Sequence, residues 1–263
     1  MSADACTPTA AGLARRVVLI TGGARRLGRA IALALADAGW DVAVHYRASP
    51  EEAQALCEQL RARGARAQAF HADLEDPARA RALLAQAVHA MGAVDAVVNN
   101  ASLFEHDAVD QLDADLAMRH HRVNVLAPVL LTQALHAHLS ARGARGCVVN
   151  LLDQKLWNPN PDHLSYTLSK AALREATTLL AQGLAPVLRV VGVAPGLTLE
   201  GPGIDPARLA QLKRQGPLGH GPGAADVADA VRFCLTNPAL TGTTILVDSG
   251  QHLQPRSRDF SFD

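Results

Sequence analysis

A tyrosine and a lysine four residues apart carry the clearest chemistry in this sequence. Tyr166 and Lys170 lie in a helical pattern, and a spacing of four places both side chains on one face of a helix. A phenol with a pKa of about 10 is a poor acid–base catalyst at neutral pH until a neighbouring cation stabilises its phenolate. Lys170, one of only three lysines in the chain, would supply that cation. The pair indicates a proton-transfer site, although this spacing also arises by chance in many helices.

A glycine-rich turn follows the first apolar run. Residues 17–20 lead into Thr21-Gly22-Gly23-Ala24-Arg25-Arg26-Leu27-Gly28, and a helical pattern follows directly. Glycines let the backbone approach a pyrophosphate, which lies at a helix N-terminus where free N–H groups and the helix dipole favour anions. This order predicts a dinucleotide-binding turn, and an ordinary tight turn is the alternative. The predicted cofactor contacts here are Gly22, Arg25, Arg26, Leu27 and Gly28.

The end of the second predicted strand favours NADPH over NADH. A carboxylate at this position would bind a ribose 2′-hydroxyl, whereas a cation would accept a 2′-phosphate. The sequence here is His45-Tyr46-Arg47-Ala48-Ser49, which contains no acid. Arg47 and Ser49 could bond the phosphate, with His45 alongside and Arg25 reaching over from the first turn. A solvated arginine and a helix-capping serine are the alternative interpretation.

Strands and helices must alternate along the chain to bring these residues together. Strands are predicted at 17–20, 41–46, 65–70, 94–98, 146–152, 188–193 and 243–247. The intervening helices include one opened by a capping box at 49–52 and a long stretch over 112–142, bent near Pro128. Strands that are apolar at most positions belong to a parallel sheet covered on both faces. We therefore expect an α/β fold, a single doubly wound Rossmann-type domain of about seven parallel strands, with ligands at the strands' carboxyl ends.

The amino-acid composition and charge limit the classes of protein to which this chain can belong. The 263 residues are 49% hydrophobic and 19% charged, with 25 basic and 25 acidic side chains. This balance suits a folded core and argues against nucleic acid or a membrane surface as a partner. No apolar run reaches the roughly 18 residues of a membrane span, and the start of the chain does not resemble a signal peptide. We expect a cytoplasmic protein with a flexible arm at 1–15, one domain at 16–253 and a tail at 254–263.

No metal site or disulfide framework is predicted. Cys6, Cys57, Cys147 and Cys234 lie far apart without a paired spacing. His120-His121 and His136-x-His138 lack zinc-like geometry, because neighbouring helical residues point in different directions. We expect reduced core thiols at Cys57 and Cys234, and surface or interface histidines.

Several motifs occur together in a recognisable order. Asp73-Leu74 follows the third predicted strand, Asn99-Asn100-Ala101 the fourth, and Pro195-Gly196 the sixth, with the glycine turn before them and the Tyr/Lys pair among them. Over about residues 16–253 the chain resembles the short-chain dehydrogenase/reductase family. The resemblance implies a seven-stranded parallel sheet, a nicotinamide cofactor and a homotetramer.

The resemblance also implies roles for individual residues. Asp73 and Leu74 would flank the adenine, Asn100 the cofactor ribose, and Thr198, after Pro195-Gly196, the carboxamide. Lys170 would bind the nicotinamide ribose while tuning Tyr166, and Asn124 would hold the water of a proton relay.

Two departures from the common family pattern point to one branch. Asp153 stands where the family usually has a serine, thirteen residues before the tyrosine, and Arg26 replaces the middle glycine of the first turn. Both replacements are similar to the pteridine reductase branch, which includes the dihydromonapterin reductases. Asn99-Asn100-Ala101-Ser102-Leu103-Phe104 and His45-Tyr46 resemble that branch as well.

The chemistry of these two residues agrees with a pterin substrate. Carbonyl reduction benefits from a hydroxyl that bonds the developing oxyanion, whereas a carboxylate such as Asp153 would repel it. Reduction of a C=N bond delivers hydride to carbon and a proton to nitrogen, and Asp153 bonded to Tyr166 can take part in that delivery. Arg26 would place a planar cation beside the phosphates and the pterin edge. Phe104 could stack on the pterin, with Ser102 near the ring edge.

Plainer interpretations of these residues stay open. Arg26 could be a surface side chain, Phe104 ordinary packing, and Asp153 a helix cap. Trp157 could line the substrate pocket or pack at a subunit interface. The loop at 197–223 should cover the substrate. In the tail, Arg256 is the nearest match to an arginine that reaches a neighbour's active site in the resembling branch, and a frayed polar tail is the default.

Three functions follow from this sequence. The first is an NADPH-dependent reductase of pteridines such as dihydromonapterin, dihydrobiopterin or dihydrofolate, with Tyr166 and Asp153 delivering the proton. The second is an NADPH-dependent carbonyl or 3-oxoacyl-thioester reductase of the same family. The third is a cofactor-binding scaffold or sensor, against which the intact set of Asn124, Tyr166 and Lys170 argues.

Overall fold

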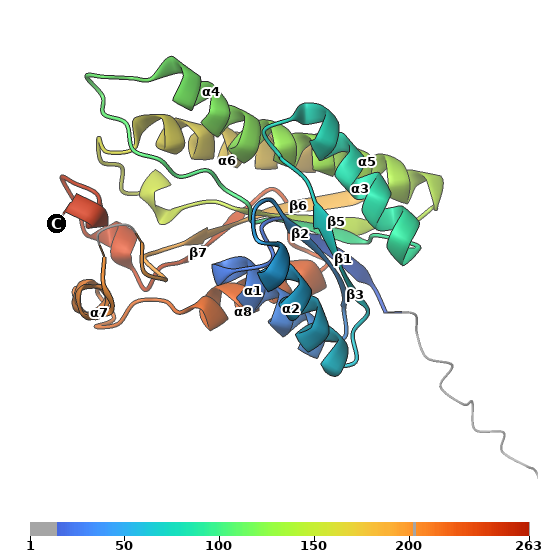
Figure 1. Cartoon of the computed structure of the whole chain (residues 1–263). Coiled ribbons are helices and arrows are strands. Elements are labelled where there is room, and N and C mark those ends of the chain that lie inside the picture. Colours follow the sequence, from blue (N-terminus) through green and yellow to red (C-terminus); the bar gives the residue numbers. More distant parts are fainter. Residues whose placement is uncertain (1–14, 202–203, 263) are drawn as a thin grey trace, which may run out of the picture.

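Seven parallel strands form one sheet in the computed structural model, which describes residues 15–201 and 204–262. The strand order is β3-β2-β1-β4-β5-β6-β7, so the winding direction reverses between β1 and β4 (Figure 1). The strands are β1 Val17–Ile20, β2 Asp41–Tyr46, β3 Ala67–His71, β4 Ala96–Asn99, β5 Gly146–Leu151, β6 Leu188–Pro195 and β7 Thr244–Val247. This confirms the predicted doubly wound α/β fold. The arm predicted at 1–15 falls almost wholly outside the described residues.

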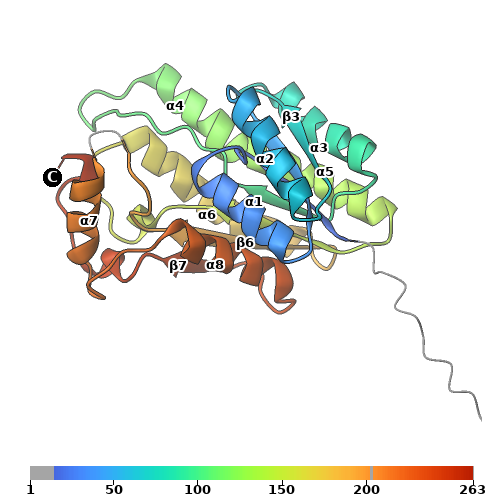
Figure 2. The same ribbon diagram turned by 60° about the horizontal axis from the view of Figure 1, so that its bottom comes forward.

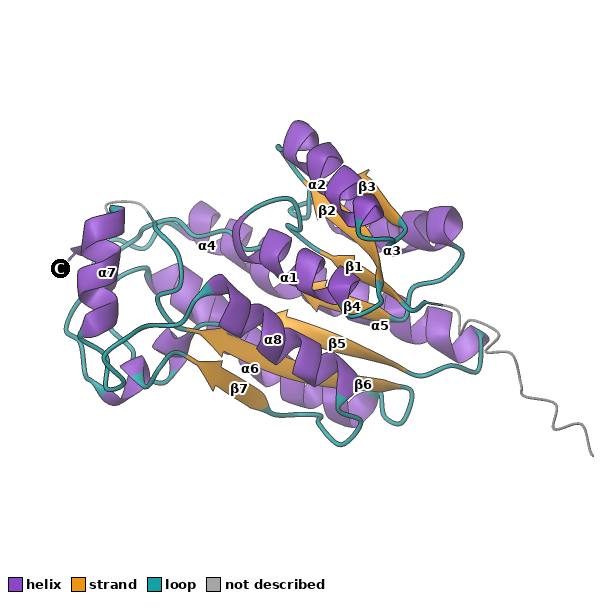
Figure 3. Cartoon of the chain, turned by 90° about the horizontal axis from the view of Figure 1, so that it is seen from below, coloured by secondary structure: helices purple, strands orange, loops and turns teal. Residues whose placement is uncertain are grey.

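Helices cover both faces of the sheet. One layer contains α1 (Arg26–Asp37), α2 (Pro50–Ala62) and α8 (Ala224–Thr236), and the opposite layer contains α3 (Pro77–Met91), α5 (Ala127–Ala141) and α6 (Leu164–Gly183) (Figures 1 and 3). Successive strand residues point to opposite faces, so in β1 Val18 and Ile20 join the core under α1, α2 and α8, whereas Val17 and Leu19 join the other. Burial on both faces explains why the strands are apolar at nearly every position.

The long helix predicted over 112–142 is interrupted earlier than expected. It consists of α4 (Ala114–His121), a π-helical turn at Arg122–Leu126, and α5. Pro128 is the second residue of α5 and has no N–H to bond the preceding helical residues, so the irregularity lies directly before the proline. The π-helical turn carries Asn124, and such turns are frequent at functional sites.

The starts of α3 and α2 differ in how they are capped. Asp76 caps α3, because its side chain accepts hydrogen bonds from the N–H groups of Ala78 and Arg79. At α2, Pro50 occupies the first turn, but Ser49 makes no side-chain capping bond, so the predicted capping box is wrong. The Ser49 hydroxyl is thus not committed to the helix it precedes.

The C-terminal segment folds back against the body of the protein. After β7, short 3₁₀ turns at Gln251–Leu253 and Phe260–Phe262 bring the chain's end beside α7 (Pro206–Arg214) (Figure 2). Arg258 donates from Nε to both carboxylate oxygens of Asp162, at 3.1 and 2.9 Å. The expectation of a frayed tail is therefore wrong for residues 254–262. Within the described ranges, no helix is long and apolar enough to cross a membrane.

Candidate active site

A cavity of about 710 Å³ opens at the carboxyl ends of β1, β4, β5 and β6. Its position follows from the fold, because ligands of doubly wound sheets bind where the winding direction reverses. Two predicted site residues, Asn124 and Trp157, are not among its lining residues in the described part of the chain. The predicted residues that do line it are Gly22, Arg25, Arg26, Leu27, Gly28, His45, Tyr46, Arg47, Ser49, Asp73, Leu74, Asn100, Ala101, Ser102, Phe104, Asp153, Tyr166, Lys170, Pro195, Gly196 and Thr198.

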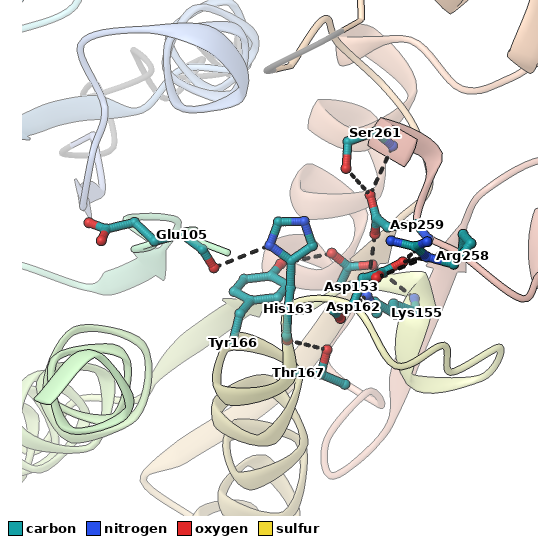
Figure 4. A network of polar contacts seen from close by, with 10 residues as sticks. All are labelled: Glu105, Asp153, Lys155, Asp162, His163, Tyr166, Thr167, Arg258, Asp259 and Ser261. Carbon is teal, nitrogen blue, oxygen red and sulfur yellow. Dashed lines mark hydrogen bonds and ion pairs between the residues drawn. The ribbon is translucent and has the colours of Figure 1, made fainter. Parts of the chain in front are cut away.

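The Tyr166 hydroxyl donates a hydrogen bond of 2.7 Å to Oδ2 of Asp153 (Figure 4). Asp153 leaves β5 and caps the 3₁₀ turn Gln154–Leu156, so its other oxygen accepts the N–H of Lys155 at 2.8 Å. The capping role proposed as an alternative for Asp153 is thus present together with the contact to Tyr166. One carboxylate oxygen fixes the side chain and the other faces the phenol.

Burial raises the pKa of both members of this pair. The pKa of Tyr166 is raised well above 10, first by burial and then by the charge of Asp153. The pKa of Asp153 is raised by burial, although hydrogen bonds from Lys155 and Tyr166 and the charge of Lys170 oppose the shift. The sequence predicted that Lys170 would stabilise a phenolate. The opposite direction holds, because burial is the larger cause and the charge of Asp153 adds to it, so Tyr166 is a neutral phenol that holds its proton.

Lys170 lies one helical turn beyond Tyr166 and is buried. Its ammonium donates to the carbonyl of Leu151 at 2.8 Å and lies 5.8 Å from the centroid of the Tyr166 ring. Burial lowers its pKa to about 8, with Asp153 acting in the opposite direction. The lysine remains mostly charged at neutral pH and anchors the end of β5 to α6.

Asn124 does not line the cavity and instead bonds the chain segment behind its wall. Its amide bonds both backbone groups of Leu103: Oδ1 accepts the N–H at 2.8 Å and Nδ2 donates to the carbonyl at 3.0 Å. Nδ2 also donates to the Ser169 hydroxyl at 2.9 Å, and Oδ1 accepts from the Ser102 hydroxyl at 3.2 Å. These contacts fix the segment between β4 and α4 against α6. The water-holding role of Asn124 stays a prediction.

The first turn fits a bound pyrophosphate. No side chain in the described part of the chain caps α1, and its first turn contains no acid, whereas aspartates cap α3 and α4. The N–H groups at this helix start are therefore available to an anion. The turn is also packed tightly, since Gly22 has a φ of +60° and a Cβ there would lie 3.1 Å from the Cα of Ala101. These features support a dinucleotide phosphate at this position.

We predict that Gly28→Ala destabilises the protein and weakens cofactor binding. A Cβ on Gly28 would lie 2.2 Å from the carbonyl oxygen of Gly22 and 2.7 Å from Nδ2 of Asn100, so the turn would have to shift. Overpacking of this kind costs about 1–3 kcal/mol. Thermal unfolding with and without NADPH would measure both effects. Gly183→Ala is the matched control, because nothing lies within 4 Å of a Cβ there.

Arg26 adopts a conformation that favours glycine. Its φ is +53°, in the left-handed region, which explains why a glycine commonly occupies this place. Its guanidinium donates to the backbone carbonyl of Glu200, from the loop after β6. Arg26 thus spans the cavity mouth and is more than a solvated side chain. Arg25 pairs with Glu52 at 3.6 Å, at the start of α2.

His45 does not provide a cation for a phosphate. Its Nδ1 accepts the N–H of Gly22 at 3.0 Å and its Nε2 lies 3.1 Å from the carbonyl of Ala72. Burial lowers its pKa to about 4, so the ring is neutral and both nitrogens are used. His45 was predicted to assist in binding the phosphate. Its role in the structure is instead to fix the first turn against β2 and β3. Arg47, exposed at the end of β2, remains the cation at this edge.

An aromatic group forms one side of the cavity. The Phe104 ring meets Tyr166 edge-on at 4.6 Å and stacks on His163 at 4.2 Å, yet it is 40% exposed and lines the cavity. Trp157 instead packs beside the cluster of Leu152, Leu173 and Ala194. His120 was expected at the surface or at an interface but is buried inside the chain, with Nδ1 2.8 Å from the Ser165 hydroxyl.

Part of the cavity wall consists of residues that the sequence did not indicate. Several neighbours of Asp153 and three residues near the chain's end line it: Gln154, Lys155, Asn158, Asn160, Asp259, Phe260 and Ser261. Arg256, which was considered as an arginine that reaches a neighbour's active site, lines the cavity of its own chain. The available signal was Lys155 itself, because a lysine two residues from Asp153 is unusual in a chain with only three lysines. The loop at 197–223 contributes Leu197, Leu199 and Ile204, and Lys213 holds it by donating to the carbonyls of Thr198 and Pro222.

Comparison with known proteins agrees with this geometry. A family model described as short chain dehydrogenase matches residues 16–202. The chain is similar to the crystal structure of FolM alternative dihydrofolate reductase 1 from Brucella canis complexed with NADP, with a TM-score of 0.85, 40% identity and coverage of 91% of this chain and 95% of that one. It is also similar to a blue fluorescent protein from a metagenomic library in complex with NADPH, with a TM-score of 0.82, 32% identity and coverage of 90% and 97%.

The curated proteins of similar sequence have more varied descriptions than these solved structures. An uncharacterised oxidoreductase from Mycobacterium tuberculosis (strain CDC 1551 / Oshkosh) is 37% identical over 248 residues, which are 89% of this chain and 91% of the relative. A 3-oxoacyl-[acyl-carrier-protein] reductase from Staphylococcus aureus (strain Mu50 / ATCC 700699) is 29% identical over 249 residues, 89% of this chain and 97% of that protein.

Proposed function

The chain belongs to the short-chain dehydrogenase family, and from this premise we propose that it is an NADPH-dependent reductase of pteridines. One observation carries the proposal: the hydroxyl of Tyr166 is bonded at 2.7 Å to Asp153. A carboxylate at this position disfavours an oxyanion and favours proton delivery to a ring nitrogen. The similarity to Brucella alternative dihydrofolate reductases supports the same substrate class, since dihydrofolate contains a pteridine ring.

Each residue of the site has its own role in the proposed reaction. NADPH, when bound, supplies a hydride to a carbon of the pterin C=N bond. The neutral phenol of Tyr166 gives its proton to the neighbouring nitrogen, and Asp153, at hydrogen-bond distance and with a raised pKa, takes up a proton from solvent and passes it to the phenolate that remains. Lys170 holds the end of β5 in place through the Leu151 carbonyl and, as the family resemblance implies, the nicotinamide ribose. Phe104 provides a flat apolar face for the ring.

We predict that Arg47→Ala lowers the affinity for NADPH about tenfold and leaves the affinity for NADH within about twofold. The proposed contact is a charge-assisted hydrogen bond to the 2′-phosphate, which NADH lacks. Fluorescence titration with both cofactors would measure the change. Arg29→Ala is a matched control, because Arg29 is exposed on α1 and bonds Gln59 instead of lining the cavity. Equal catalytic efficiency of the wild-type enzyme with NADPH and NADH would contradict the cofactor assignment.

A substrate panel tests the proposed function directly. Loss of NADPH absorbance would be followed with dihydromonapterin, dihydrobiopterin and dihydrofolate, and in parallel with simple ketones and a 3-oxoacyl thioester. Efficient reduction of a pterin and slow reduction of the ketones is the expected outcome. The reverse order would favour the alternative, a carbonyl or 3-oxoacyl-thioester reductase, which the Staphylococcus aureus relative supports.

Cofactor binding without turnover of any compound would instead favour the scaffold or sensor.

The homotetramer, the cytoplasmic location and the division into a domain at 16–253 and a tail remain predictions. Size-exclusion chromatography with light scattering would check the first of them.

A further inference from the structure

Phe104 and Tyr166 lie on separate parts of the chain, and the proposed reaction requires them at a fixed distance. Phe104 belongs to residues 103–107, here called the β4–α4 segment, which contains no helix or strand. Tyr166 is the third residue of α6, and the two rings meet edge-on with their centroids 4.6 Å apart. Without regular secondary structure, the segment depends on side chains from other elements for its position.

His120 connects the β4–α4 segment to α6. Its side chain is fully buried in the last turn of α4, and it is not among the cavity-lining residues in the described part of the chain. Nε2 accepts the N–H of Glu105 at 3.3 Å, and Nδ1 lies 2.8 Å from the hydroxyl oxygen of Ser165. Because a peptide N–H can only donate, Nδ1 carries the ring hydrogen and donates it to Ser165. Burial lowers the pKa of His120, which agrees with a neutral ring.

Asn124 makes a similar connection one helical turn further along. Four residues after His120, it bonds the backbone of Leu103 and the hydroxyl of Ser169. Compared with the partners of His120, these are displaced by two residues along the β4–α4 segment and by four along α6. Two residues of extended chain span about 6.6 Å and four helical residues about 6 Å. Both connections therefore fit the same placement of the segment against the two helices.

Asp107 fixes the other end of the β4–α4 segment to the start of α6. Its side chain is buried, and both carboxylate oxygens accept the N–H of Ser165, at 3.0 and 3.2 Å. His163, the residue before α6, makes no side-chain capping bond. Asp107 thus supplies, from 58 residues away, the carboxylate that a helix start favours. Ser165 is held by Asp107 at its backbone and by His120 at its side chain, one residue before Tyr166.

The ring of His163 supports Phe104 from the other side. Its Nδ1 donates to the carbonyl of Glu105 at 3.1 Å (Figure 4), and its ring stacks on that of Phe104 with the centroids 4.2 Å apart. The N–H and the carbonyl of Glu105 are therefore bonded by two buried histidines, His120 and His163. Because Phe104 directly precedes Glu105, these bonds fix its place in the cavity wall.

We propose that His120 is a positioning residue of the site: as a neutral ring with its hydrogen on Nδ1, it sets the distance between Phe104, which supports the substrate ring, and Tyr166, which delivers the proton. An imidazole suits this role because one nitrogen accepts while the other donates, in a different direction. A displacement of reacting groups by about 1 Å costs up to about 10²-fold in rate. The role in catalysis rests on the proposed function, whereas the hydrogen bonds of His120 do not.

His120→Leu and His120→Gln test the role in turnover. Leucine fills much of the same space but makes neither bond, so we expect kcat with dihydrobiopterin to fall about tenfold while the Kd for NADPH stays within about twofold. In His120→Gln the amide oxygen can accept the N–H of Glu105 from nearly the position of Nε2. One of the two bonds is then kept, and kcat should stay within about threefold of wild type. Thermal unfolding would show that both proteins are folded.

Thr177→Val is the matched control for damage to α6. Thr177 is also buried on this helix, where its hydroxyl accepts from the amide of Asn150 and donates to the carbonyl of Leu173. We expect this variant to unfold at a lower temperature and to keep the wild-type kcat, because its partners lie on β5 and on α6 itself. Wild-type kcat in a folded His120→Leu protein, or an equal loss in Thr177→Val, would overturn the proposal. So would a His120→Gln protein no more active than His120→Leu.

Two further measurements need no substrate. Backbone hydrogen exchange in the β4–α4 segment should be faster in His120→Leu than in wild type and unchanged in Thr177→Val. Nitrogen NMR of protein labelled at histidine, with the His120 signals identified by their absence from the His120→Gln spectrum, should show a hydrogen on Nδ1 and none on Nε2 at neutral pH. Unchanged exchange or the other tautomer would contradict the proposal. If dihydrobiopterin is not reduced, the proposed function fails, whereas these measurements still decide how the segment is held, and kcat is then compared with the 3-oxoacyl thioester.

Discussion

Tyr166→Phe is expected to lower turnover by about 10²-fold or more while the affinity for NADPH stays within about twofold. General acid catalysis by a positioned side chain contributes on this scale. The substitution removes one oxygen atom, the one that bonds Asp153 at 2.7 Å. The remaining ring can still pack edge-on against Phe104, and Lys170 keeps its bond to the Leu151 carbonyl. This variant should therefore lose turnover while it keeps its affinity for NADPH.

Single-turnover absorbance measurements would report the chemical step, and fluorescence titration would report cofactor affinity. Thr167→Val is a suitable control, because it removes a hydroxyl from the next residue of α6, where Oγ1 bonds only the carbonyl of His163 among the described residues. Wild-type turnover by the Tyr166→Phe protein would mean that the proton comes from another group. Equal losses in both variants would point to damage of the helix instead.

The parts of the fold that depend on local pattern could be predicted from the sequence. Runs such as Val17–Ile20 are apolar at every position because they are buried on both faces, and this distinguishes parallel strands from half-exposed ones. Predicted and observed strand ends differ by two residues or fewer. Tyr166 and Lys170 were identified from a helical spacing, which local sequence fixes. Their common cavity then followed from the topology.

The electrostatic state of the site could not be predicted in the same way. The direction of the Tyr166 pKa depends on burial and on which charge is nearer, and a spacing of four residues contains neither quantity. His45 looked like a phosphate ligand, but the depth of β2 in the sheet makes it neutral. The attachment of residues 254–262 was missed because Asp162 and Arg258 are 96 residues apart, and only the folded chain brings this buried acid to that arginine.

Asp153→Ser is expected to change the preferred substrate. Pterin reduction should fall at least about tenfold, because the group that returns the proton to Tyr166 is lost. Ketone reduction should rise, because a serine hydroxyl can donate to a developing oxyanion that the carboxylate repels. Asp153→Ala should lose pterin reduction without gaining ketone reduction. The substrate panel, run at saturating NADPH on all three proteins, would measure the ratio of the two activities.

The pH dependence of turnover gives an independent test of Asp153. Burial raises its pKa above the ordinary 3.8, so the acid form persists to higher pH than in an exposed aspartate. If that form supplies the proton, kcat with a pterin is highest below the raised pKa and falls as the pH increases through it. In Asp153→Asn this descending limb should disappear, since the amide does not titrate, and the remaining turnover should be low and flat over the same range. A descending limb that survives unchanged in Asp153→Asn would assign the titration to another group, with Lys170, whose pKa is about 8, as the first to be examined.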